Sequence, residues 1–189
     1  SLATYDVVIM FQTSGMVWDT EAQRQAVQTY VRDGGGIAAI HNATDMGIES
    51  EFPWWDDLVN AGAHMPSHSP GVLQGTAKVA DHQHASTAGL PDRWQRAEEW
   101  YNFDQNIRGK AHVLVTADER TYNPGGDAMG ADHPISWCRD VGLSKVWSTA
   151  MGHPQGSYSE QLFIQHLLGG VKTAAKVIPS DCSATVDSA

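Results

Sequence analysis

Short apolar runs alternate with amphipathic segments over the first forty residues of the chain. Residues 5–11 form an apolar run rich in β-branched side chains, which predicts a buried strand. Apolar residues then recur at helical spacing over residues 20–32, a segment that begins with the Thr-x-x-Gln spacing of a capping box. Three glycines at 34–36 end this helix, and residues 37–40 form a second buried strand. This order predicts two parallel strands joined by a helical crossover.

The remainder of the chain continues with weaker signals of the same two kinds, and the alternation predicts an α/β fold. Residues 52–61 predict a short helix, and a last helix is expected from a capping Ser159 to about residue 176. Residues 177–189 are small and polar, so we expect a tail or linker after a single domain of residues 1–176. Five further strands are expected at residues 72–80, 96–103, 113–117, 135–138 and 145–149.

Charge and composition narrow the classes of partner. The chain carries 22 acidic and 12 basic residues and a formal net charge of -10, which disfavours nucleic-acid binding because phosphate backbones are repelled. The surface is compatible with a neutral ligand or a bound cation. No apolar run approaches the roughly 20 residues that a membrane-spanning helix needs, so we expect no membrane insertion.

The two cysteines, Cys138 and Cys182, leave two alternatives open. They are either independent buried or free thiols, or one disulfide that joins the C-terminal tail to the body of the domain. A bridge closing a loop of this length would contribute on the order of 4 kcal/mol and would imply an oxidising compartment.

His41 directly follows the second expected strand, at the edge where open parallel sheets bind ligands. Its unperturbed pKa of about 6.5 suits general acid or base chemistry, and a ring nitrogen can also bind a metal. A hydrogen-bonded structural histidine is the alternative.

Three further side chains are candidates for the same catalytic site. Glu98 and Glu99 are neighbours in an expected strand, so one of them, taken to be Glu99, faces a cleft. His133 lies in a glycine-rich loop, and His153 lies at a strand end. Convergence of Glu99, His133 and His153 with the first candidate would give the donors of a zinc-like divalent metal site. The metal ligands would then be His41, His133 and His153.

Aromatic side chains near these candidates offer apolar faces on which a sugar ring can stack. We expect this of Trp100 and Tyr101, with core packing as the alternative for each. Of Trp54 and Trp55, one is expected in the core and the other at a pocket. The candidate substrate-binding residues are Asp45, Trp55, Trp100, Tyr101 and Asp132.

Several runs of sequence, taken together and in order, resemble the ThuA-like (trehalose-utilisation) family, a branch of the class I glutamine-amidotransferase-like fold. The resemblance implies a three-layer, mostly parallel, flavodoxin-like sheet flanked by helices, and a carbohydrate ligand. Amidotransferases of this fold place a nucleophilic cysteine at the turn that carries His41 here, so glutamine hydrolysis is not expected. The matching runs are residues 34–45, 98–103, 129–138, 152–153 and 167–171.

Two departures from the family pattern concern the ends of the chain. Family members usually begin with an earlier strand, so we expect a sheet that lacks the family's first strand, with a missing N-terminal segment or a partner supplying it. Residues 181–186 resemble the linker of secreted multidomain relatives, which implies an extracellular protein with further domains.

Two functions follow from the residues and the resemblance together. The first is an enzyme of hydrolase or isomerase type that acts on a disaccharide or keto-sugar, by acid–base chemistry of His41 and Glu99 or by a metal-bound water. The alternative is a non-catalytic sugar-binding or scaffold module of a larger secreted protein. The sequence specifies neither the exact sugar nor the oligomeric state.

Overall fold

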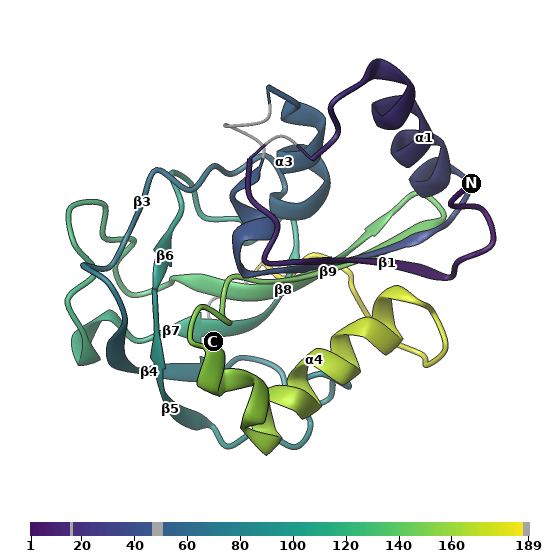
Figure 1. Ribbon diagram of the computed structural model, residues 1–189. Helices are drawn as coiled ribbons and strands as arrows, with labels where there is room; N and C mark the ends of the chain where they lie inside the picture. The colour runs from purple at the N-terminus through teal and green to yellow at the C-terminus, as the bar shows by residue number, and fades with distance from the viewer. Residues whose placement is uncertain (16, 47–50, 187–189) are drawn as a thin grey trace.

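The computed structural model describes residues 1–15, 17–46 and 51–186, which form a twisted seven-stranded sheet between two helical layers (Figure 1). The strand order is β1–β2–β9–β8–β7–β4–β5, and β3 (Ser67–His68) and β6 (Tyr101–Asn102) form a second, small sheet. The expected three-layer α/β class is confirmed. The main strands are β1 (Val7–Phe11), β2 (Gly36–Ile40), β4 (Leu73–Val79), β5 (Arg93–Glu98), β7 (His112–Ala117), β8 (Pro134–Val141) and β9 (Ser144–Thr149). The helices are α1 (Glu21–Arg32), α3 (Pro53–Asn60) and α4 (Gln161–Ala174), with short 3-10 turns η1 (His41–Thr44), η2 (Glu119–Thr121) and η3 (Gln155–Ser159).

Strand direction differs between the two halves of the sheet. β1, β2 and β9 are parallel, and the crossover between β1 and β2 is α1, as the sequence predicts. Every neighbouring pair from β9 to β5 is antiparallel, so the sheet is mixed rather than mostly parallel. The connections explain the difference, because a two-residue turn at Gly142 and Leu143 joins β8 to β9. So short a link reverses the chain, whereas a parallel pair needs a long crossover.

The helices cover opposite faces of the sheet: α1 and α3 lie on one face and α4 on the other (Figure 1). Successive side chains of β2 alternate between these faces, so Ile37 and Ala39 pack with α1 and α3, while Ala38 and Ile40 join the α4 core. All five residues of β2 are therefore buried, which explains its continuous apolar pattern. No helix in the described ranges combines the length and apolar character that crossing a membrane requires.

The helix ends agree with the sequence at α1 and differ at α4. Thr20 and Gln23 form the predicted capping box, with the Gln23 N–H 3.2 Å from the Thr20 hydroxyl oxygen and the Thr20 N–H 2.9 Å from the Gln23 side-chain oxygen. The expected cap Ser159 is wrong, because η3 extends to this residue and α4 begins after Glu160 without a side-chain cap.

The expected strand over residues 96–103 is interrupted. β5 ends at Glu98, Glu99 and Trp100 lie outside both strands, and β6 pairs with β3 in the small sheet. Ser69 stabilises this two-residue link, since its N–H donates to the Trp100 carbonyl at 2.8 Å and its hydroxyl accepts from the Trp100 N–H at 3.0 Å. This interruption lifts Glu99 out of the regular ladder of the main sheet.

The C-terminal tail is covalently joined to the sheet. Cys138 in β8 and Cys182 form a disulfide, which decides between the two alternatives left open by the sequence. Further along, the Thr185 N–H donates to the Ala111 carbonyl at 3.0 Å.

The strand β1 forms one edge of the main sheet, and no strand in the described part of the chain pairs with its outer side.

Candidate functional site

His41 occupies a strained backbone position at the carboxyl end of β2. Its φ of +55° lies in the left-handed region, which costs a non-glycine residue on the order of 1 kcal/mol. Because β2 and β9 are parallel neighbours, the residues that follow β9, from Ala150 to His153, lie at the same edge of the sheet. The sheet thus brings together two segments that are far apart in the sequence.

The His41 ring is oriented by a backbone carbonyl. Its Nδ1 lies 2.8 Å from the Ala150 carbonyl oxygen, which can only accept a hydrogen bond, so Nδ1 carries the proton. In the neutral ring, Nε2 then keeps its lone pair, and burial favours this state by lowering the pKa of His41. Nε2 faces the hydroxyl oxygen of Tyr101 and Nδ1 of His153, both at 3.2 Å.

Glu99 completes the group from the two-residue link between β5 and β6. Its Oε2 lies 3.1 Å from Nδ1 of His153 and 3.5 Å from Nε2 of His41. We call His41, Glu99 and His153 the site triad. Their side chains are 1%, 14% and 45% exposed, so the triad extends from the buried sheet edge to solvent.

The donor set of the triad fits a divalent metal of the zinc type. One ligand atom from each residue lies within 4.8 Å of the others, and the set is two imidazoles and one carboxylate. Catalytic zinc sites use such sets and keep a further position for water or substrate. The bond from His41 to the Ala150 carbonyl is the kind of outer contact that fixes the tautomer of a metal-binding histidine.

His133, expected with this group, has its ring nitrogens engaged elsewhere. Nε2 lies 2.7 Å from the Tyr101 carbonyl oxygen, and Nδ1 lies 2.9 Å from Oε1 of Glu119. The ring is fully buried. In this arrangement His133 supports the backbone of Tyr101 and does not join the site triad.

The aromatic candidates are mostly core residues. Trp55 is 0%, Trp100 1% and Tyr101 2% exposed, so none of these rings offers a face to a sugar. The expected stacking by Trp100 and Tyr101 and the expected pocket role of Trp55 are therefore wrong in this structure. Trp55 donates from Nε1 to the Ala43 carbonyl at 2.7 Å, and Trp100 stacks on Tyr122 with ring centroids 4.8 Å apart. Their large apolar areas fill the two cores on opposite faces of the sheet, Trp55 in the core with α1 and α3 and Trp100 in the core with α4.

The two acidic candidates also lie outside the triad. The Asp132 carboxylate accepts from Nε of Arg108 at 2.7 Å and from the Asn106 side chain at 2.8 Å, and the Arg108 bonds lower the pKa of Asp132. Asp45 follows η1 as its C-terminal cap and is partly buried.

His68 is a neighbour of the site that the sequence did not reveal. Its Nδ1 lies 3.5 Å from Oε1 of Glu99, and its side chain is 43% exposed. The pairing of β3 with β6 brings it there, since His68 lies opposite Tyr101. A two-residue strand carries no periodic signal, so this placement had no detectable signature in the sequence.

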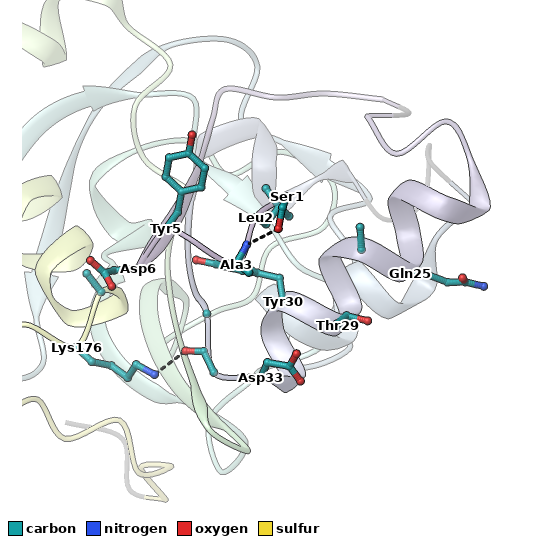
Figure 2. Close-up of a pocket in the computed structure, with 14 residues that line it drawn as sticks. Ser1, Leu2, Ala3, Tyr5, Asp6, Gln25, Thr29, Tyr30, Asp33 and Lys176 are labelled. Carbon is teal, nitrogen blue, oxygen red and sulfur yellow. Dashed lines mark hydrogen bonds between the residues drawn. The ribbon is translucent and has the colours of Figure 1, made fainter.

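A separate cavity of about 500 Å³ lies at the opposite ends of the parallel strands from the triad (Figure 2). It is lined by the N-terminal segment, α1 and Lys176, and its residues include Asp6 before β1 and Gly35 before β2. It therefore lies at the amino ends of these strands, away from the edge where parallel sheets bind ligands, and shares no residue with the triad.

The two cysteines of this chain do not take part in the site. The chain has two cysteines, and they are bonded to each other. The turn after β2 carries His41 instead of a thiol. Neither cysteine is free to act as a nucleophile in this state.

Comparison with known proteins places the fold. A family model described as ThuA, trehalose utilisation, matches residues 1–174. A ThuA-like protein of Bacteroides uniformis has a TM-score of 0.72 at 22% identity, over 92% of this chain and 70% of that chain. A ThuA-like protein of Parabacteroides merdae has a TM-score of 0.66 at 22% identity, over 97% and 79%.

A more distant neighbour is a Salmonella typhimurium protein described as cytoplasmic, with a TM-score of 0.65 at 13% identity over 92% of this chain and 73% of that one. No match was found among the curated proteins. Because the family model spans the whole sheet and all three members of the triad, the chain belongs to the ThuA, or trehalose-utilisation, family.

Proposed function

We propose that this domain is a sugar-active enzyme of hydrolase or isomerase type whose reaction takes place at His41, Glu99 and His153. The convergence of these side chains carries the proposal, since His41 and His153 are 112 residues apart and their ring nitrogens lie 3.2 Å from each other. The family description, trehalose utilisation, supports a disaccharide as the substrate, and a keto-sugar is the other substrate class that we propose.

The roles of the side chains follow from their protonation and exposure. Nε2 of His41 is a lone-pair acceptor within reach of Glu99, and the Tyr101 hydroxyl is a neighbouring donor. A proton removed from a sugar hydroxyl, or from a carbon next to a carbonyl, can be received by His41 or Glu99 and returned to the product. His153 is the most exposed member and the first to meet a substrate.

A divalent, zinc-like cation fits the same three side chains. When bound, such an ion polarises a carbonyl oxygen or lowers the pKa of a bound water. The proposal therefore has a metal-assisted form and a metal-free acid–base form, which differ in one measurable quantity, the metal content of the protein.

The first experiment is elemental analysis of chelator-washed protein after incubation with zinc and desalting. We expect about one zinc per chain in the unmodified protein and loss of that zinc in His41→Ala. His82→Ala is the matched control, because His82 is a partly exposed histidine paired with Asp92 on the surface. Equal zinc content in the unmodified protein and in His41→Ala would show that the zinc is not bound at this site.

A substrate assay then tests the enzyme itself. Incubation with trehalose and with keto-sugars, followed by NMR, should show turnover by the unmodified protein and by His82→Ala, and none by His41→Ala. Turnover that persists in a folded His41→Ala variant would refute the assignment.

A second candidate is a non-catalytic sugar-binding or scaffold module of a larger secreted protein. The Cys138–Cys182 disulfide favours the secreted setting, because such bonds persist in oxidising compartments. Calorimetric binding of a sugar without turnover would favour this candidate. Free thiols in protein purified without reductant would argue against secretion.

A further inference from the structure

Glu98 is fully buried one residue before Glu99, at the end of β5. Its Oε1 accepts from the Arg96 guanidinium, with Nε at 2.9 Å. Its Oε2 accepts from the backbone N–H of Gly152 at 2.9 Å and from that of His153 at 3.2 Å. Each of these contacts is a donor, which suits a carboxylate. Glu98 is thus joined by a peptide bond to Glu99 and by a hydrogen bond to the backbone of His153.

The backbone that Glu98 binds is fixed on its other side as well. Gly152 has a φ of +123°, and a Cβ there would lie 2.6 Å from the hydroxyl oxygen of Tyr158, so a side chain does not fit. The Gly152 carbonyl accepts from the Tyr158 hydroxyl at 2.8 Å and from Nε2 of Gln12 at 2.7 Å. The peptide before His153 is therefore held in one orientation from both sides.

Arg96 fixes Glu98 in turn. The Arg96 side chain is 0% exposed, and its guanidinium carbon lies 4.3 Å from the Trp94 ring centroid and 4.5 Å from that of Phe163. Its Nη2 also donates to the Ser157 hydroxyl at 3.0 Å. A guanidinium enclosed by two rings has little freedom, so the carboxylate paired with it is equally restricted.

We propose that Glu98 is the positioning residue of the site, and that its buried carboxylate sets the separation between the Glu99 carboxylate and the His153 ring. The effect of Glu98 on activity rests on the proposed function, since a displaced His153 would lower the metal affinity of the triad or misplace a proton acceptor. The contact itself is independent of that function. Outer contacts of this kind change metal affinity about 10- to 100-fold when removed.

Two substitutions of Glu98 test the idea in the full chain. Glu98→Gln keeps the shape but replaces one acceptor oxygen with a donor. Glu98→Asp keeps the charge opposite Arg96 but withdraws the carboxylate by one methylene, which covers the case in which the Gln variant fails to fold. Glu160→Gln is the matched control, because Glu160 also contacts Arg96, at 3.3 Å, but is 45% exposed and touches no part of the triad backbone.

Three measurements are made on each folded variant: cobalt(II) affinity, hydrogen exchange of the Gly152 and His153 amides, and the nuclear Overhauser contact between the His41 and His153 rings. The centroids of these rings are 5.2 Å apart. We expect both Glu98 variants to exchange these amides faster, to lose the ring contact and to bind cobalt about 10- to 100-fold more weakly. Glu160→Gln should behave as the unmodified protein does.

The outcomes separate the two proposals. If the unmodified protein binds no cobalt, the metal-assisted form of the function fails, and amide exchange and the ring contact still decide the role of Glu98. A folded Glu98 variant that retains both the amide protection and the ring contact overturns the positioning role, whatever its affinity for cobalt.

Discussion

Among the described residues, two clusters contain the donors of a metal site, and they differ in where the histidine proton lies. In the site triad, Nδ1 of His41 donates a hydrogen bond to the Ala150 carbonyl, and the lone pair on Nε2 faces Tyr101. The second cluster consists of His84, Cys138 and Cys182, and its histidine has the opposite tautomer. The Ser86 N–H donates to Nδ1 of His84 at 3.2 Å, so Nε2 carries the proton and faces the sulfur of Cys138.

The comparison shows that proximity of donors does not make a site. In the second cluster the two sulfurs are already bonded to each other and the imidazole is a donor, so every group is satisfied internally. Burial lowers the pKa of His84 to about 4 and that of the nearby His166 to about 3. We therefore expect the second cluster to govern stability and the site triad to govern ligand binding.

The largest expected effect on stability is that of acid on two buried histidines, His84 of the second cluster and the nearby His166. The pKa values of His84 and His166 are lowered in the folded state, so their contribution is complete above about pH 6.5 and is lost as the pH falls, when the unfolded chain takes up the protons. By pH 4.5 the loss is on the order of 2 to 3 kcal/mol for each histidine.

Urea unfolding at pH 7.5, 6.5 and 4.5 measures this loss. His84→Gln should reduce the pH dependence below 6.5, whereas His82→Gln, which alters a partly exposed surface histidine, should leave it unchanged. A free energy of unfolding that stays constant between pH 6.5 and 4.5 would contradict the role given to the buried histidines.

Removal of the disulfide is the next largest effect. The bond joins residues 44 positions apart, and the double variant Cys138→Ala with Cys182→Ala should be less stable by about 2 to 4 kcal/mol, because the unfolded chain gains freedom. Thermal unfolding without reductant measures the change. Zinc content should be unaltered, and a loss of zinc in the folded double variant would mean that the two clusters are not independent.

The smallest expected effect on stability is at Glu99. Its side chain is partly exposed, so Glu99→Gln should change the free energy of unfolding by less than about 1 kcal/mol. Zinc or cobalt affinity should nevertheless fall at least tenfold, because an anionic ligand is lost. Titration beside urea unfolding checks both values, and an unchanged affinity would exclude Glu99 from the metal site.

The sequence predicted those parts of the fold that rest on local patterns. The run at residues 5–11, the capping box of Thr20 and Gln23, and the histidine after β2 all depend on near neighbours in the chain, and the structure has each of them. His41 and His153 came from their placement at strand ends, and Glu99 from its pairing with Glu98 inside an expected strand, together with the family resemblance.

The parts that could not be predicted depend on contacts across the sequence. Residues 96–103 have the pattern of one strand, and the interruption after Glu98 reflects two hydrogen bonds between Ser69 and Trp100, which are 31 residues apart. Burial of Trp100 depends on close packing against Gly75, where a Cβ would lie 2.7 Å from the indole. His133 is directed away from the triad by Glu119 and the Tyr101 carbonyl, and no local pattern encodes these partners.

The disulfide also determines how the domain carries mechanical load. A pull applied to the chain beyond Cys182 passes through the Cys138–Cys182 bond into β8, which has hydrogen-bonded strands on both sides. β9 and α4 lie inside the covalent loop, so tension from this end bypasses them. The segment that carries His153 is in the same loop and would remain unstretched while the tail is under force.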